Sequence, residues 1–155
     1  MSDAETYPSQ EQLDRYAEQF NQSLTLKHHG ARMSFPSREK VVVTAEVRPE
    51  HRGGLGSDAV NGGVISALFD LVIGSTPALR DPTRRSATVQ LSISFERPLR
   101  GNLLRAEATI DTLGASTVFA SARMYDAQGV VCARCQGVVQ MSRMKWASGE
   151  SPAVN

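Results

Sequence analysis

A single carboxylate stands inside an apolar segment near the middle of the chain. Asp70 belongs to the stretch 61–74, whose sequence is NGGVISALFDLVIG. Burial raises the pKa of a carboxyl group, because desolvation disfavours its charged form, and such a group can act as a base near neutral pH. Asp70 is therefore the residue whose type and setting point most directly to chemistry.

The residues that open this stretch predict a helix start that a ligand can approach. Asn61 is of a type that caps helices well, and Gly62 and Gly63 carry no side chains that would shield the first backbone amides. The N-terminus of a helix attracts anions and oxyanions. We expect an anion or an oxyanion to be attracted to this helix start.

Small or polar residues form one stripe along the predicted helix. Gly63, Ser66, Asp70 and Gly74 share this stripe, while the remaining faces are apolar, as is typical of a buried helix. Either a substrate chain or another helix could lie against the stripe. Equally, Asp70 could be an acid of a core helix, satisfied by a backbone amide or by a residue of a neighbouring subunit.

The rest of the chain predicts a short helix and six strands around this central helix. A capping-box pattern at Ser9 and Gln12 starts an amphipathic helix that ends near residue 21. Strands are predicted over 24–34, 40–48, 87–96, 103–112, 117–125 and 130–141. This order contains no βαβ unit and favours an α+β fold in which an antiparallel sheet wraps one helix. We divide the chain into an N-terminal segment (1–23), a domain (24–142) and a polar tail (143–155).

Composition points to neither a nucleic-acid nor a membrane partner. The 17 basic and 16 acidic residues give a net charge of +1, which predicts neither a nucleic-acid nor a membrane partner. No window of about 18 residues is uninterruptedly apolar, and residues 1–5 lack the basic and apolar regions of a signal peptide. We expect a cytoplasmic protein.

The cysteines and histidines do not predict a metal or redox site. Cys132 and Cys135 have the spacing of a C-x-x-C motif, but on a strand residues three apart face opposite sides. His28 and His29 also fall on a predicted strand, where neighbours point in opposite directions. His51 is interpreted as a loop-positioning or surface histidine. No metal is proposed.

The order of elements, together with the segment 61–74, resembles the hotdog-fold acyl-CoA thioesterases, particularly the phenylacetate-degradation-like subgroup. The resemblance covers roughly residues 41–141. In that family a His-Gly-Gly motif opens the central helix and the acid follows nine residues after the His, a spacing that Asn61 and Asp70 share. The run 88–95 also resembles the strand that follows the helix in the family.

The resemblance implies roles for several residues. Asp70 would attack the thioester carbonyl, either as a nucleophile or as a base acting through water, while the amide of Gly63 polarises the carbonyl oxygen. Thr88 would orient the water or the acid, often across a dimer interface; alternatively it is an ordinary threonine on the polar face of a strand. Gly62 and Ser66 would lie beside the substrate.

Two positions depart from the family pattern. Asn61 replaces the usual His; it can cap the helix and donate a hydrogen bond, but it does not titrate near pH 7. Gly53 stands about where relatives carry an Asn, inside a longer loop.

Coenzyme A would enter as part of the substrate, so no separate cofactor is expected. Its phosphates suit arginine, and four arginines flank the strand after the helix: Arg84, Arg85, Arg97 and Arg100. These could equally be solvated surface residues. The resemblance further implies a homodimer or homotetramer, with sheets paired edge to edge.

Three functions are compatible with these features. The leading hypothesis is an acyl-CoA thioesterase, a hydrolase whose acyl group the sequence does not reveal. The alternative is an acyl-CoA-binding hotdog protein without turnover, suggested by Asn61 in the His position. A dehydratase or hydratase on the same fold ranks last, because those relatives usually need a catalytic His and the helix has none.

Overall fold

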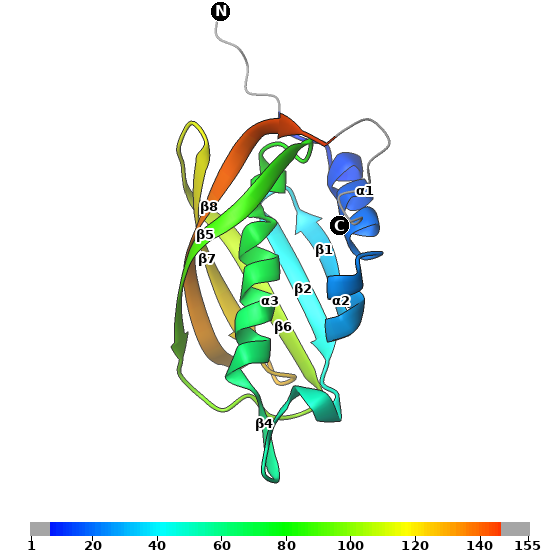
Figure 1. The fold of residues 1–155 in the computed structure, drawn as a ribbon, viewed down its shortest axis with the longest axis vertical. Helices are drawn as coiled ribbons and strands as arrows, with labels where there is room; N and C mark the ends of the chain where they lie inside the picture. Colours follow the sequence, from blue (N-terminus) through cyan, green and yellow to red (C-terminus); the bar gives the residue numbers. More distant parts are fainter. Residues whose placement is uncertain (1–6, 147–155) are drawn as a thin grey trace, which may run out of the picture.

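The computed structural model describes residues 7–146 and shows a curved antiparallel sheet wrapped around one central helix (Figure 1). The helical elements are α1 (Gln10–Phe20), α2 (Leu24–His29), η1 (Pro49–His51), α3 (Gly62–Gly74) and η2 (Thr76–Leu79). The strands are β1 (Ala31–Ser37), β2 (Lys40–Glu46), β3 (Arg52–Gly54), β4 (Ser57–Val60), β5 (Arg84–Phe95), β6 (Leu103–Leu113), β7 (Thr117–Tyr125) and β8 (Val131–Lys145).

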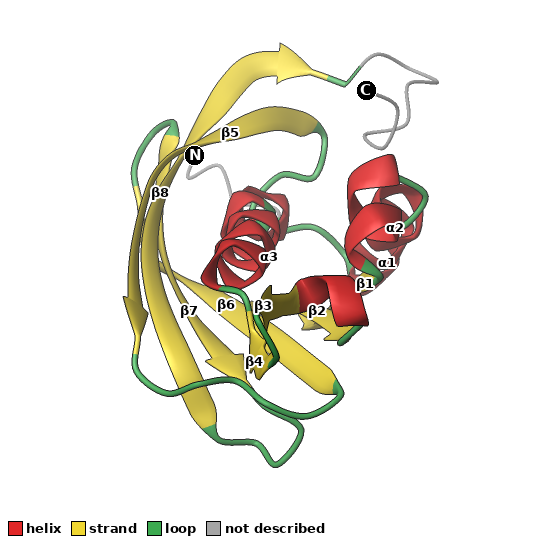
Figure 2. Cartoon of the chain, turned by 60° about the horizontal axis from the view of Figure 1, so that its bottom comes forward, coloured by secondary structure: helices red, strands yellow, loops and turns green. Residues whose placement is uncertain are grey.

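The main sheet has six strands in the order β1-β2-β6-β7-β8-β5, with every neighbouring pair antiparallel. Figure 2 shows this sheet curling around α3, with α1 and α2 on the side of the helix that the sheet leaves open. The predicted α+β class and the hotdog arrangement are confirmed. β1 and β5 are the two edges of the sheet.

Helix α3 supplies the centre of the core. Its buried side chains are Ile65, Leu68, Phe69, Val72 and Ile73, and they face the inner sides of the surrounding strands. The segment Gly62–Leu79 has a mean hydropathy of 1.5 over 18 residues, enough by length and composition to cross a membrane, but 56% of it is buried inside the fold. The apolar side chains of this segment therefore pack against the sheet.

The N-terminal helix forms as its sequence predicts. Ser9 caps α1 in a capping box with Gln12, and both hydrogen bonds of the box are present. At the other end of the helix, the Asn21 side chain accepts from the Met33 amide at 2.7 Å and donates to the Met33 carbonyl oxygen at 2.9 Å. These bonds fix α1 against β1.

The prediction of a strand over residues 24–34 is wrong for its first half. Residues 24–29 form α2, because Ser23 caps the start of this helix and Gly30, at φ 61°, ends it in the left-handed conformation. His28 and His29 consequently do not point in opposite directions: their ring centroids lie 5.2 Å apart. Between residues 7 and 146, no group of three or more His, Cys, Asp or Glu side chains could hold a metal ion.

Smaller differences concern the loops and the C-terminal end. The glycine-rich segment before α3 forms the β3–β4 hairpin that projects at the bottom of Figure 1. The connection after α3 begins with the buried turn η2. β8 continues to Lys145, beyond the start predicted for the tail at residue 143, because this end still pairs with Arg84. The remaining tail, 147–155, lies outside the described residues.

Gly137 lets α3 approach the sheet closely, which gives a test of this packing. A Cβ atom at Gly137 of β8 would lie 2.5 Å from Cγ2 of Ile73 and 3.0 Å from Cδ2 of Leu91. We expect Gly137→Ala to lower the free energy of unfolding by about 1–3 kcal/mol, the usual effect of overpacking a core. Denaturant unfolding measures this. Gly53→Ala is the control, because its Cβ would meet nothing closer than 3.4 Å, and equal effects of the two changes would contradict the packing.

Candidate functional site

The side chain of Asn61 caps α3, as predicted, and in doing so occupies an amide assigned to catalysis. Its Oδ1 accepts a hydrogen bond from the Gly63 amide at 2.7 Å. The Gly62 amide has no acceptor among the described residues. The Gly63 amide can therefore bind a carbonyl oxygen only if Asn61 turns away, whereas the Gly62 amide is already available.

His51 holds the loop that leads into α3. Its carbonyl oxygen accepts from the Asn61 amide at 2.8 Å, and its Nδ1 accepts from the Arg48 amide at 3.0 Å. The side chain is only 3% exposed. Of the two interpretations of His51, loop positioning is thus confirmed and a surface location is wrong.

Phe95 and Ser66 border the first turn of α3. A Cβ atom at Gly62 would come within 3.3 Å of the Phe95 ring, so the aromatic side chain of β5 rests directly on the glycine backbone. The hydroxyl of Ser66 donates to the Gly62 carbonyl oxygen at 2.7 Å. The Ser66 side chain therefore stabilises the first turn of α3.

Asp70 is exposed in the single chain, so the expectation that the fold itself buries this acid is wrong. The reason is the direction of the small-residue stripe. Gly62, next to the first residue of the stripe, contacts Phe95, and Gly74 at the end of the stripe contacts Thr88; both partners lie on the edge strand β5. The stripe thus faces the open side between α3 and β5, and Asp70 lies midway along it.

Thr88 faces the helix because of an irregularity in β5. It pairs with Val139, whereas Gln90 pairs with Val138, so Val89 is an extra residue that forms a β-bulge. A Cβ atom at Gly74 would lie 2.9 Å from the Thr88 hydroxyl oxygen, and Val89 is 61% exposed. The alternative of a threonine on the outer polar face is therefore wrong. The alternation of the sequence could not reveal this inversion, because a bulge shifts it by one residue.

Asp70 and Thr88 line one half-open cavity of about 270 Å³. Its remaining walls come from the last turn of α3, the start of β5, α1 and the end of β8: Tyr16, Phe20, Leu71, Gly74, Ser75, Ser86, Ala87 and Trp146. The sequence predicts an apolar face on α1 but not its destination, so α1 and Trp146 are the part of the site that sequence reasoning misses.

Tyr16 joins α1 to the end of α3. Its hydroxyl hydrogen-bonds the Ser75 side chain, and burial raises the pKa of Tyr16 to about 12, an effect that the Ser75 bond partly offsets. Ser75 in turn donates to the Leu71 carbonyl oxygen at 2.8 Å. The phenol therefore stays neutral at physiological pH and anchors α1 beside Asp70.

Both cysteines are buried and free, so no disulfide joins them. Cys135 lies on β8, where burial, with a smaller contribution from the negative charge of Asp70, raises the pKa of its thiol to about 11. Burial also raises the pKa of Cys132. Both side chains therefore remain thiols near neutral pH, which disfavours redox chemistry or metal binding.

The four candidate arginines do not form one cluster within the chain. Arg84 and Arg85 lie at the start of β5, where Arg84 Nε donates to the Ser142 carbonyl oxygen at 2.7 Å and Arg85 packs over the Trp146 ring. The other two follow the far end of β5, where Arg97 is exposed and Arg100 forms an ion pair of 2.9 Å with Asp58. The two pairs lie at opposite ends of β5, whose 12 residues begin with Arg84 and Arg85.

Solved structures with the same fold include several thioesterase-related proteins. The PaaI protein from the phenylacetic acid degradation operon of Escherichia coli superposes with a TM-score of 0.73 at 19% identity, over 86% of this chain and 98% of that one. The thioesterase HI1161 of Haemophilus influenzae gives a TM-score of 0.72 at 17% identity, over 89% and 93%. A thioesterase-superfamily-related protein of Shewanella oneidensis gives 0.74 at 20%, over 85% and 96%. At these identities the likeness shows the fold.

Sequence comparison points to the same family as the fold. No curated protein sequence matches the chain. The family model described as thioesterase superfamily matches residues 58–133, a range that begins in β4 and includes α3 and Asp70. This match over 76 of the 155 residues and the hotdog fold together support a hotdog-fold thioesterase family with phenylacetate-degradation-like members.

Proposed function

We propose that this protein is an acyl-CoA thioesterase that hydrolyses the thioester with Asp70. The observation that carries the proposal is that Asp70 and Thr88 line one cavity, while the first turn of α3 offers the unpaired Gly62 amide. A carboxylate, a hydroxyl and a helix N-terminus are the groups that thioester hydrolysis needs. The match to the thioesterase superfamily supports the same chemistry.

Asp70 has two possible routes. As a nucleophile, its carboxylate adds to the carbonyl carbon, the coenzyme A thiolate leaves, and water then hydrolyses the mixed anhydride. As a general base, it takes a proton from water, whose oxygen adds to the carbonyl carbon before the thiolate leaves. Thr88 hydrogen-bonds the water or the carboxylate in either route. The products are the carboxylic acid and the free thiol of coenzyme A.

The carbonyl oxygen gains negative charge as the tetrahedral intermediate forms. Eight residues of helix put the start of α3 about 12 Å from Asp70 of the same chain, so we assign the stabilisation of this oxygen to the amides at the start of α3 in the partner subunit, where the helix dipole adds to their effect. The Gly62 amide is free, and the Gly63 amide joins it when the Asn61 side chain turns away from its 2.7 Å bond. Phe95, resting on Gly62, shields this position from water.

A second subunit would complete the site. β5 is an unpaired edge of 12 residues, and Val89 (61% exposed) and Phe95 (56%) leave apolar surface along it. Such an edge needs a partner or protection. We propose a homodimer, alone or within a homotetramer, in which β5 pairs with β5 of the partner subunit. This pairing would cover the open side of α3 and remove Asp70 from bulk water.

The same pairing would bring the separated arginines together. Two antiparallel copies of β5 place the start of one strand beside the end of the other. Arg84 and Arg85 of the partner subunit would then lie near Arg97 and Arg100 of the first chain. We propose that this combined group binds the phosphates of coenzyme A.

A protein that binds acyl-CoA without hydrolysing it is the second candidate. The observation that favours it is the bond from the Gly63 amide to Asn61, since a capped amide does not stabilise an oxyanion. Mixing the protein with a panel of acyl-CoA thioesters and measuring free thiol distinguishes the two candidates. Binding without thiol release supports the second.

Asp70→Asn tests the assigned acid. The amide keeps the shape and much of the hydrogen bonding but cannot act as base or nucleophile, so we expect turnover to fall by at least about a hundredfold with folding intact. Asp111→Asn is the control, because this exposed carboxylate of β6 hydrogen-bonds Ser121 outside the Asp70 cavity. Unchanged thiol release by Asp70→Asn would exclude the proposed mechanism.

Asn61→Ala tests the helix cap. We expect the free energy of unfolding to fall by about 1 kcal/mol and turnover to fall with it, because the first turn of α3 loses the bond that orders it. Asn61→His should preserve or raise activity. The matched control is Ser23→Ala, which removes the cap of α2 and should lower stability without lowering turnover. If Asn61→Ala hydrolyses as fast as wild type, the side chain has no role in turnover.

The oligomer is tested by light scattering. We expect a mass of at least twice the 16.8 kDa of one chain, because β5 is an unpaired edge. Val89→Lys, which places a charge at the exposed bulge of β5, should shift the assembly toward the monomer and lower turnover in parallel. A fully active monomer would contradict a site shared between two chains.

A further inference from the structure

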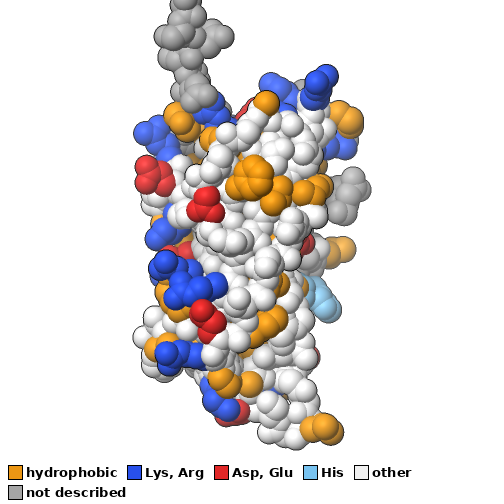
Figure 3. Space-filling view, turned by 90° about the vertical axis from the view of Figure 1, so that its left-hand side faces the viewer, with side chains coloured by type: hydrophobic (Ala, Val, Ile, Leu, Met, Phe, Trp, Pro, Cys, Tyr) orange, Lys and Arg blue, Asp and Glu red, His pale blue; other side chains and the backbone are white. Residues whose placement is uncertain are grey.

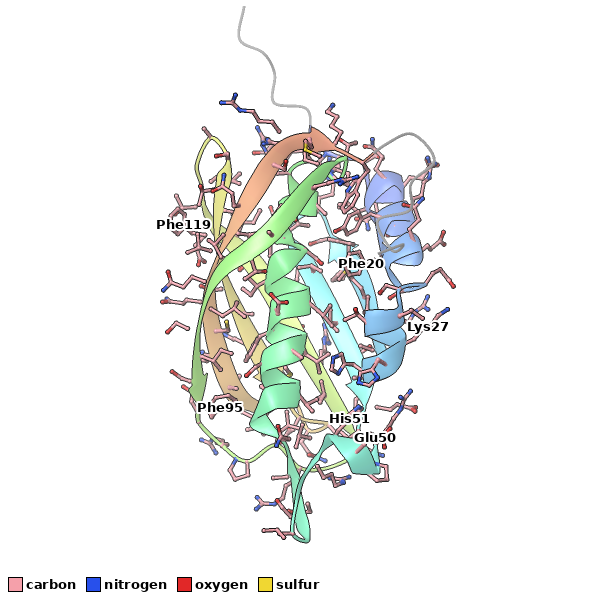
Figure 4. All side chains as sticks on the ribbon, in the orientation of Figure 1. Phe20, Lys27, Glu50, His51, Phe95 and Phe119 are labelled. Atoms are coloured by element: carbon pink, nitrogen blue, oxygen red, sulfur yellow. The ribbon has the colours of Figure 1, made fainter. Side chains whose placement is uncertain are left out.

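The cavity beside Asp70 has a second end, which α1 closes. Figure 4 shows Phe20 between α1 and α3, on the same side of the sheet as the helix. Its ring stacks on that of Tyr16, with centroids 5.6 Å apart, and both rings line the cavity together with Trp146. One end of the cavity is thus a carboxylate with a hydroxyl, and the other is a wall of aromatic rings.

We propose that this aromatic end binds the acyl group of the substrate, and that Phe20 and Trp146 restrict it to compact apolar acyl groups. The inference rests on the proposed hydrolysis, since it assumes that the thioester carbonyl lies at Asp70. Compact here means a short chain or a single ring joined by a short linker. Long fatty acyl chains would be excluded.

The charge of the lining favours the acyl group over the coenzyme A moiety. Among the described residues that form the cavity, Asp70 alone carries a charge. A phosphate would therefore meet a carboxylate and no compensating cation. An apolar group instead gains about 25 cal/mol for each Å² of its surface that leaves water against the aromatic rings.

The volume of the cavity limits the size of the acyl group. The cavity measures about 270 Å³, whereas a cavity of about 150 Å³ in a protein core suffices for benzene. A ring with a short linker, or a chain of similar volume, therefore fills the space between Asp70 and Phe20. With the partner subunit covering the open side of the cavity, a long acyl chain would have to displace α1.

The wall is fixed in place, so it can exclude larger groups. α1 is held at its start by Gln10, whose Nε2 donates to the Phe35 carbonyl oxygen at 2.7 Å, and at its end by the paired bonds of Asn21 to Met33. The hydrogen bond of Tyr16 to Ser75 ties the middle of the helix to α3. α1 can exclude larger acyl groups because moving this helix would break these hydrogen bonds.

The experiment compares thioesters of coenzyme A with butanoyl, phenylacetyl and hexadecanoyl groups. For wild type we expect kcat/KM for the two compact groups to exceed that for hexadecanoyl by at least about tenfold. Phe20→Ala should raise the hexadecanoyl-to-butanoyl ratio by at least about tenfold, because it opens the wall. Phe20→Leu is a smaller truncation that should shift the ratio in the same direction. It replaces Phe20→Ala in the experiment if Phe20→Ala does not fold.

Phe119→Ala is the matched control. Phe119 is 45% exposed on β7, and Figure 4 shows it on the opposite side of the sheet from α3. Figure 3 views the side formed by β5, β7 and β8, where hydrophobic side chains gather in the upper half among uncharged polar residues. Removing the phenyl ring of Phe119 should leave the hexadecanoyl-to-butanoyl ratio unchanged. Equal shifts for Phe20→Ala and Phe119→Ala, or efficient hydrolysis of hexadecanoyl-CoA by wild type, would overturn the proposal.

A binding measurement separates failure of this proposal from failure of the proposed hydrolysis. Trp146 is the single tryptophan of the chain and lines the cavity, so its fluorescence reports occupancy. The probes are ketone analogues of the three thioesters, in which a methylene replaces the sulfur. If no thioester releases thiol, hydrolysis is disproved; fluorescence changes with the compact analogues alone then still support the acyl pocket. No fluorescence change with any analogue would overturn it.

Discussion

The structure depends on the burial of α3 against the inner face of the curved sheet. Leu68, Phe69, Val72 and Ile73 are fully buried, and the missing side chain of Gly137 lets the helix lie close to β8. A helix with apolar residues on most of its circumference needs contact on most sides, so the sheet must curve around it. The one stripe that tolerates exposure carries Asp70. The position of the acid and the curvature of the sheet thus follow from the same packing.

Much of this arrangement could be predicted from residue order. The cap at Asn61, the capping box at Ser9 and the alternation of apolar residues in the late strands are local signals, and each matches the structure closely. The prediction failed where caps outweighed alternation, as in α2, whose strand-like sequence lies between a capping Ser23 and a left-handed Gly30. It also failed at Val89, since a bulge leaves no periodic trace.

The site was harder to predict than the fold, because it depends on contacts between segments far apart in sequence. Asp70 and Thr88 share a cavity as proposed partners should, but the burial expected for Asp70 is absent from the single chain. The link between Tyr16 and Ser75 joins helices nearly sixty positions apart, and no local pattern encodes it. Likewise, nothing in the spacing of Asn61 and Gly63 shows that the cap occupies the Gly63 amide.

The bulge at Val89 also bears on what else could attach to the molecule. A regular edge strand exposes an even row of donors and acceptors, and any extended polypeptide can add to it, which is how ordered aggregates begin. The extra residue near the centre of β5 bends this row and breaks its spacing. A second copy related by two-fold symmetry carries the same bend and can match it, whereas a straight foreign strand cannot. The irregularity that turns Thr88 toward the helix therefore also protects the chain from open-ended growth.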